Sequence, residues 1–346
     1  MLEFGCHHHT LELTVGAAFY DLFQNSKDPN LPFFEKLEKE WDTINKGNYR
    51  TAASARKLRC IPEADELIKF CREQLKERQP RGDYEESLQL ILVFLGSVVP
   101  GKVVYTFKKP GCRSKCRWMA IIIYSMKSWM FGKKLKLKPE EDSNLFKLCV
   151  FLCRAYVRTW FLAPLSPQAP RNDLAYLQVL YRNKDEGSHW EAALEKFMNH
   201  LWYLSATSVP MALFDNGVAV DEKRRMVAAL RRGTDRSPPS PRAEVQLDDT
   251  VLDLKLSDFC SKQSLRFFSA TAISTDFLKK DPEHWKSDSD GLNIVTHFKI
   301  VNDCAERGVA LINRNLKGNT LTVDEEQRQL LLLVVANDRK QHQLRS

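Results

Sequence analysis

The segment RWMAIIIYSMKSWMF, residues 117–131, is apolar or aromatic on nearly every side. It contains neither proline nor glycine, so no residue in it interrupts a helical backbone. A surface helix has one apolar stripe and one polar face, whereas a helix that is apolar all round is buried. The segment therefore predicts a central buried helix.

Helical periodicity continues on both sides of that segment. Leu11, Val15 and Phe19 recur at four-residue spacing, which predicts a buried helix face over Leu11–Phe23. Further helices are predicted at Pro62–Arg78, Tyr84–Leu95, Glu140–Phe161, Asp173–Tyr181, Trp190–Leu204, Val220–Arg231, Thr250–Phe268, Leu292–Asn313 and Val323–Val335. The stretch Val99–Pro110 is predicted to be a short strand or an extended loop. The predicted fold class is mainly α.

Composition sets broad limits on the protein. The 346 residues suffice for about two domains, and 43% hydrophobic and 28% charged residues are typical of globular proteins. We find no signal peptide and no apolar run of the ~18–20 residues that a membrane helix needs. Nine scattered cysteines predict reduced, intracellular thiols. The net charge of +8 at pH 7 favours an anionic partner such as nucleic acid.

The segment Arg231–Asp248, RRGTDRSPPSPRAEVQLD, is rich in proline, serine and charge. Because it has little apolar surface to offset the entropy of ordering, we predict a mobile linker there. A second boundary is marked by the polar stretch Lys286–Gly291. The predicted organisation is a helical region over residues 1–290 and terminal helices over 291–346.

A basic and aromatic stretch leads into the central helix. Its members are Lys102, Lys108, Lys109, Arg113, Lys115, Arg117 and Trp118. Lysine and arginine neutralise phosphates, and a flat indole stacks on an unpaired base. The alternative is a solvated basic loop whose Trp118 belongs to the core. A second set of lysines either extends this patch or places cations favourably at a helix C-terminus. The second set is Lys133, Lys134, Lys136 and Lys138.

Cys6-His7-His8-His9 combines residue types that ligate zinc. A four-ligand site needs a second pair of ligands, and the nearest cysteines, Cys112 and Cys116, have no matching histidine nearby. Two interpretations remain open. One is a zinc-dependent structural protein centred on Cys6 and His9, and the other is ordinary packing and hydrogen bonding.

Two acidic features complete the candidate sites. Asp303 and Glu306 lie one helical turn apart, so they share a helix face on which they either ligate a hard divalent cation or remain plain surface charges. Asp215 follows an apolar run and precedes Asn216-Gly217, which is typical of a turn. We therefore predict a structural role for Asp215.

Taken in order, three features resemble hAT-type DNA transposases. Cys6-x-x-His9 resembles the motif that opens their helical insertion, Arg117-Trp118 resembles the R-W pair of that insertion, and Glu306-Arg307 resembles the E-R of their last catalytic carboxylate. The chain also resembles a group of mobile-element-derived arthropod proteins along most of its length. The shared stretches run from Pro110 to Ser125, from His200 to Ser205 and from Asn302 to Ile312.

The resemblance implies an RNase H-like domain interrupted by a large all-helical insertion. In such enzymes a D-D-E carboxylate set holds two Mg²⁺ ions for phosphoryl transfer. Glu306 would be the third carboxylate, Trp118 would stack on an extruded base, and Arg117 would contact phosphate. Cys6, His9 and Arg307 would be motif residues.

This sequence departs from the family pattern at its N-terminal end. The family's two Asp residues precede the C-x-x-H motif, whereas only five residues precede Cys6 here. We therefore expect a truncated or domesticated chain with most of the central sheet absent, which binds DNA in the nucleus without catalysing strand transfer. It would hold no cofactor, and Glu306 would bind Mg²⁺ only if upstream Asp residues exist.

Two further expectations follow from that departure. Apolar helix faces that have lost their sheet would favour self-association. The alternative function is a helical protein-interaction module, with a contact face around Trp202 and Tyr203 and no role with nucleic acid.

Overall fold

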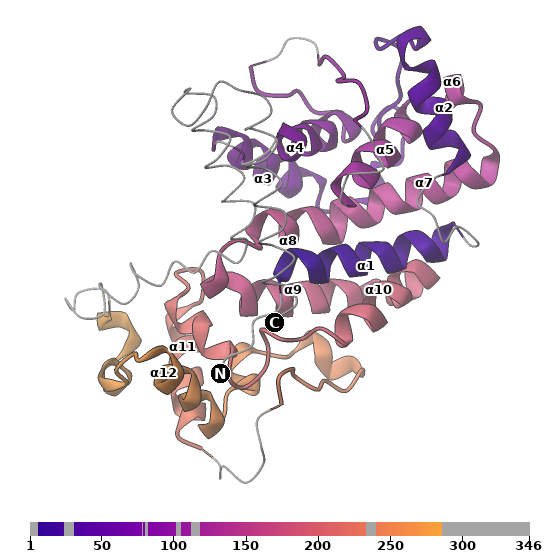
Figure 1. The fold of residues 1–346 in the computed structure, drawn as a ribbon. Helices are drawn as coiled ribbons and strands as arrows, with labels where there is room; N and C mark the ends of the chain where they lie inside the picture. The colour runs from indigo at the N-terminus through magenta and orange to yellow at the C-terminus, as the bar shows by residue number, and fades with distance from the viewer. Residues whose placement is uncertain are drawn as a thin grey trace, which may run out of the picture. The chain divides into compact units, whose positions relative to one another are not determined.

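The computed structural model describes residues 6–23, 31–77, 79, 82–101, 105–111, 118–232 and 240–285. Across these residues the regular structure is helical and contains no strand, which confirms the mainly α fold class (Figure 1). Residues 105–110 of the stretch that begins at Val99 form neither helix nor strand. The boundary predicted near residue 290 and both helices predicted beyond it lie outside the described residues.

The chain divides into two compact units. Unit 1 comprises Met1–Leu11, Leu162–Arg182 and Leu194–Ser346, and unit 2 comprises Glu12–Phe161 and Asn183–Ala193. Three helices contribute residues to both units: α1 (His7–Leu22), α8 (Val157–Leu162) and α10 (Ser188–Met198).

The predicted central helix is α5 (Trp118–Met130), at the centre of unit 2. It packs against α2 (Pro32–Glu40), α4 (Gly82–Phe94) and α7 (Pro139–Phe151), and α3 (Ala64–Lys76) covers α4 (Figure 1). Trp129 of α5 is fully buried, with its ring centroid 5.1 Å from that of Phe94 and 5.3 Å from that of Phe146. Truncating such an aromatic core residue costs about 3–5 kcal/mol.

The predicted helix Glu140–Phe161 contains a π turn. α7 is followed by the π turn η3 (Leu152–Tyr156) and then by α8. Arg154 lies in this turn, with a side chain only 8% exposed, and donates to Glu186 of the 3-10 helix η5 (Lys184–Glu186) at 2.6 Å. The π turn therefore lies where the Arg154 side chain joins η3 to η5.

Unit 1 is built around α9 (Ala169–Arg182), α11 (Val220–Leu230) and α12 (Leu265–Thr271). α9 begins earlier than predicted because Pro170 lies in its first turn, where a missing N–H breaks no helical hydrogen bond. Phe277 packs 5.8 Å from both Phe214 and Phe268.

The prediction of one helix over Thr250–Phe268 is wrong. The segment forms 3-10 helices η7 (Asp249–Leu252), η8 (Leu256–Phe259) and η9 (Lys262–Ser264) before α12 begins. Side chains of Asp248 and Ser261 accept hydrogen bonds from the backbone N–H of Thr250 and Gln263. Such local bonds compete with the α-helical pattern.

Other boundaries differ by a few residues. α10 ends at Met198 rather than continuing to Leu204, and α4 begins at Gly82, so that Asp83 lies inside its first turn rather than before it. The remaining short helices are η1 (Trp41–Thr43), η2 (Leu58–Cys60), α6 (Gly132–Leu135), η4 (Ser166–Gln168), η6 (Val209–Phe214), η10 (Asp276–Lys279) and η11 (Pro282–His284).

The second half of the predicted linker is hydrogen-bonded to a neighbouring segment of unit 1. The backbone N–H of Ala243 donates to the carbonyl of Leu201 at 3.0 Å, and Arg242 donates to the carbonyl of Asn199 at 3.0 Å. Residues 233–239 of that linker lie outside the described residues. The described end of the predicted linker is therefore hydrogen-bonded to residues 199–201, and its mobility stays a prediction.

Candidate nucleic-acid interface

The C-terminal end of α5 is closed by Arg50. Its Nε donates to the carbonyl of Trp129 at 2.7 Å, its backbone N–H donates to the carbonyl of Met130 at 3.1 Å, and its guanidinium lies 4.2 Å from the Trp129 ring centroid. Arg50 also pairs with Asp142 in the first turn of α7. The Arg50 side chain therefore contacts both the end of α5 and the start of α7.

Those connecting residues, Gly132–Lys138, are named here the lysine turn. A Cβ atom at Gly132 would lie 2.7 Å from Nη2 of Arg50, so glycine permits the close approach of the guanidinium. Leu135 is 1% exposed and anchors the turn in the core, and its carbonyl accepts from Nζ of Lys36 at 2.6 Å. The turn is therefore fixed on both sides by buried or hydrogen-bonded groups.

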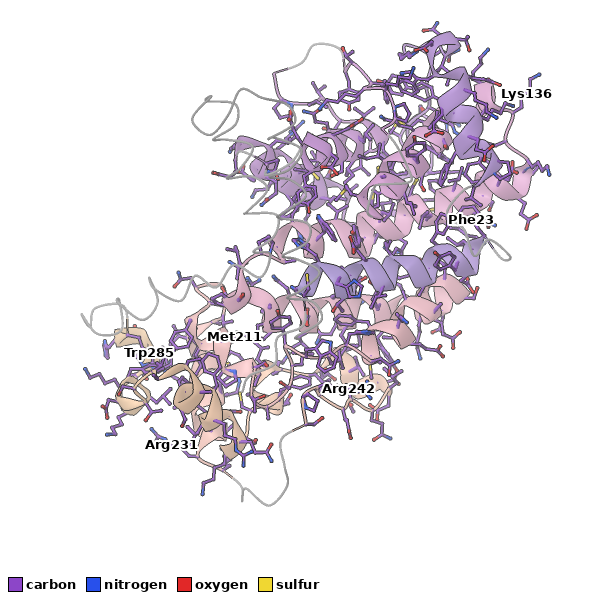
Figure 2. The ribbon with its side chains drawn as sticks, viewed as in Figure 1. Phe23, Lys136, Met211, Arg231, Arg242 and Trp285 are labelled. Carbon is purple, nitrogen blue, oxygen red and sulfur yellow. The ribbon has the colours of Figure 1, made fainter. Side chains whose placement is uncertain are left out.

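The lysine turn carries four exposed cations. Within the described residues none of their ammonium groups pairs with a carboxylate; they belong to Lys133, Lys134, Lys136 and Lys138. Figure 2 shows Lys136 at an outer edge of unit 2. Carboxylates do follow in α7, but Asp142 is held by Arg50, and Glu141 accepts from the backbone N–H of Lys138 at 2.8 Å.

The described part of the basic and aromatic stretch lies beside the same end of α5. Phe107 is buried, and its ring centroid lies 4.9 Å from that of Phe131, the residue that precedes the lysine turn. The neighbouring Lys108 is exposed, whereas Lys109 pairs with Asp42 at 3.1 Å. The contact between Phe107 and Phe131 therefore places Lys108, the next residue in the chain, near the start of the lysine turn.

The buried side chain of Lys127 connects α5 to α4 and to the backbone at Lys108. Its Nζ lies 2.6 Å from Oε1 of Glu86 and donates to the carbonyl of Lys108 at 2.7 Å. Burial lowers the pKa of Lys127, and the Glu86 carboxylate opposes that shift. Burial also raises the pKa of the Tyr105 hydroxyl, and the charges of Glu86 and Glu85 add to the effect. No local sequence pattern distinguishes Lys127, because its partners lie far away along the chain.

Several predicted site residues lie outside the described residues. They are Lys102, Arg113, Lys115, Arg117, Glu306 and Arg307. Trp118 is described only as the first residue of α5. The roles that the transposase resemblance implies for these residues stay predictions.

The four residues of the N-terminal motif differ in burial. Cys6 and His9 are exposed, whereas His7 and His8 are buried. Within unit 1, His7 pairs through Nε2 with Asp173 of α9, and its ring centroid lies 5.1 Å from that of Tyr203. Among the described residues no group of three or more histidine, cysteine or acidic side chains is placed to hold a metal ion.

Asp215 has the structural role that the sequence predicts. Its side chain is 2% exposed, accepts from Nε of Arg171 at 2.5 Å, and accepts from the backbone N–H of Gly217 at 2.8 Å. The second bond closes the turn that Asn216-Gly217 predicts.

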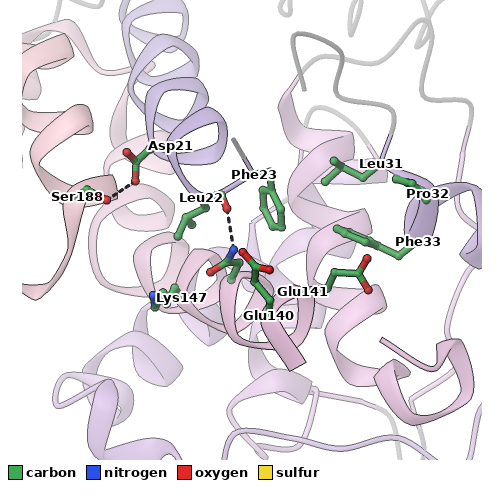
Figure 3. Close-up of a pocket in the computed structure, with 11 residues that line it drawn as sticks. Asp21, Leu22, Phe23, Leu31, Pro32, Phe33, Glu140, Glu141, Lys147 and Ser188 are labelled. Carbon is green, nitrogen blue, oxygen red and sulfur yellow. Dashed lines mark hydrogen bonds between the residues drawn. The ribbon is translucent and has the colours of Figure 1, made fainter. Parts of the chain in front are cut away.

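A pocket of about 390 Å³ lies in unit 2 where the end of α1, the start of α2 and the start of α7 meet (Figure 3). Asp21 accepts from Ser188 at 2.7 Å, and Asn144 donates to the carbonyl of Leu22 at 2.7 Å. The other lining residues are Phe23, Leu31, Pro32, Phe33, Glu140, Glu141 and Lys147. Three carboxylates against one ammonium make this pocket unfavourable for phosphate, in contrast to the lysine turn.

In the described part of the chain, no helix combines the length and the apolar character required to cross a membrane. The chain matches no protein-family model, no curated protein and no solved structure.

Proposed function

We propose that this chain is a helical DNA-binding protein of hAT-like transposase descent, which contacts the phosphate backbone through the lysine turn in the nucleus. The observation that carries the proposal is the set of four exposed lysines on a turn that Arg50 and Lys36 hold in place, with no carboxylate paired to any of them among the described residues.

Unpaired lysines suit a phosphate backbone for an electrostatic reason. Duplex DNA carries about one negative charge per 1.7 Å of axis, and each phosphate that a lysine neutralises releases condensed counterions. A lysine already bound to a carboxylate contributes little to this effect, since its charge is compensated. The ammonium groups of the lysine turn and of Lys108 remain available to phosphates in this way.

The ordered resemblance to transposases supports the same partner. Cys6-x-x-His9, Arg117-Trp118 and Glu306-Arg307 occur in the order that DNA transposases use. The proposal concerns binding alone, because Glu306 is the single catalytic carboxylate that the resemblance assigns, and a two-metal site needs more ligands than one side chain offers.

The alternative function needs an exposed apolar face around Trp202 and Tyr203. Tyr203 is 2% exposed and packs on His7, and Trp202 is half-buried. Tyr203 therefore adds no exposed apolar surface there, and the alternative function stays a prediction.

The test compares two variants that lose the same charge. In one, lysines of the lysine turn are neutralised as K133Q/K134Q/K136Q; in the control, exposed lysines of unit 1 are neutralised as K196Q/K255Q/K262Q. Binding of the full chain to a fluorescent DNA duplex is followed by anisotropy between 50 and 200 mM NaCl. We expect the slope of log affinity against log salt to fall by about 2–3 in the first variant, at ~0.9 per lost contact.

The control variant is expected to keep the wild-type slope. Equal losses in both variants would show a general charge effect without a binding surface. A wild-type protein whose affinity does not depend on salt would contradict the proposal.

A further inference from the structure

Lys136 adopts a backbone conformation that is unfavourable for lysine. It ends α6 with φ 51° and ψ 50°, in the left-handed region. Its N–H donates to the carbonyls of Gly132 and Lys133 and so closes the helix. Glycine is the usual residue at such a helix end, because a Cβ atom is crowded there.

The side chain of Lys136 offers no stabilising contact that would compensate for this cost. It is exposed, and no carboxylate among the described residues pairs with it. Attraction between the Lys136 ammonium group and the helix dipole is also a weak reason for a lysine at this position. Lys133 and Lys134 already supply cations to the last turn, and Lys36 and Arg50 already donate to the carbonyls of Leu135 and Trp129.

The position of Lys136 favours a contact with an external anion. The lysine turn is bracketed by Arg50, anchored by Leu135 and tied by the bond from the Leu137 N–H to the Gly132 carbonyl at 3.2 Å. A side chain that projects from a fixed backbone loses less entropy on binding than one on a free loop. Lys133 and Lys134 stand beside it with the same charge.

We infer that Lys136 contacts a phosphodiester group of the bound nucleic acid, and that this contact is the reason why lysine occupies a position that glycine would stabilise. The inference rests on the proposed DNA-binding function. Replacing Lys136 by glycine should therefore stabilise the fold and weaken DNA binding, and the two effects can be measured separately.

The experiment compares K136G with R56G in the full chain. Arg56 is a matched control, because it is an exposed cation of unit 2 with φ 55° that lies outside the lysine turn and its cluster of cations. Both substitutions remove one positive charge and relieve one left-handed residue. We expect each to raise Tm by about 2–4 °C. K136G alone should raise the Kd for a DNA duplex about five-fold and reduce the salt slope by about 1.

A third variant separates charge from backbone conformation. K136R keeps the cation in the same strained conformation, so it should bind with the wild-type Kd. A fall in Tm for K136G would overturn the inference, since lysine would then be serving the helix end. Unchanged affinity of K136G, with a steep wild-type salt slope, would overturn it and leave the proposed function standing. A wild-type protein without salt-dependent binding would overturn both.

Discussion

The lysine side chains of the lysine turn in unit 2 and the Arg224 side chain in unit 1 are all exposed cations, yet their charges differ in availability. The guanidinium of Arg224 is bound by Asp221 at 2.7 Å, Asp281 at 2.8 Å and Glu283 at 3.2 Å. The ammonium groups of the lysine turn have no such partners among the described residues. If the lysine turn binds an anion as we propose, pairing with carboxylates, rather than the number of basic residues, distinguishes the two surfaces.

The largest effect on stability is expected when the buried ion pair between Lys127 and Glu86 is broken. Lys127→Met leaves the carboxylate of Glu86 buried without its cation. We expect a loss of about 3–5 kcal/mol in the free energy of unfolding, measured by urea denaturation. The double variant K127M/E86Q should recover part of that loss, while K133Q in the lysine turn should change stability by less than about 0.5 kcal/mol. A loss below about 1 kcal/mol for K127M would contradict the importance of the buried pair.

A buried histidine that pairs with no carboxylate among the described residues should favour its neutral form. Burial lowers the pKa of His189 to about 4; Lys147 adds to the shift, and Asp21 and Glu186 oppose it. Because the folded state binds its proton less readily than the unfolded state, stability should fall as pH drops below the unfolded value near 6.5. We expect a loss of about 2 kcal/mol between pH 7 and pH 5, measured by urea denaturation at each pH.

The variant H189N tests the origin of that pH dependence. It removes the titrating ring while keeping a polar group, so the loss between pH 7 and pH 5 should largely disappear. An unchanged pH dependence in H189N would assign the effect to other groups.

The smallest expected effect concerns the exposed pairs of Arg224. Its guanidinium holds the pKa of Asp281 at about 2. In R224Q that pKa should rise towards its ordinary value near 3.8, as followed by NMR titration of the side-chain carboxyl groups. Tm should change little, since exposed ion pairs contribute little to stability. DNA affinity should remain at the wild-type value, whereas a fall would show that the surface around Arg224 also binds anions.

Local patterns predicted the helices that bury one continuous face. The segment 117–131 contains α5 (Trp118–Met130), and Leu11, Val15 and Phe19 are buried along α1 as their spacing indicates. The region over Thr250–Phe268 was mispredicted because hydrogen bonds from Asp248 and Ser261 to the backbone favour tight 3-10 turns. Apolar spacing alone does not reveal that competition.

The candidate interface was predictable only in part. The sequence marks Lys108, Lys109 and the lysines of the lysine turn as cations, but it leaves open whether the two sets meet. They lie at the same end of α5 because Phe107 packs on Phe131, a contact between residues 24 positions apart. Likewise, the N-terminal motif draws attention to Cys6 and His9, whereas the buried partner of Asp173 is His7.

The sequence by itself determined the helical class, the central helix, the positive charge and the turn at Asp215, because each depends on residues close together in the chain. Only the tertiary structure decided which charges are free. Lys109 is compensated by Asp42, Arg50 by Asp142 and Lys127 by Glu86, each across 41 to 92 positions of chain, whereas the lysine turn is left without such partners among the described residues. Long-range pairing follows from packing, and packing is not encoded in the local spacing of residues.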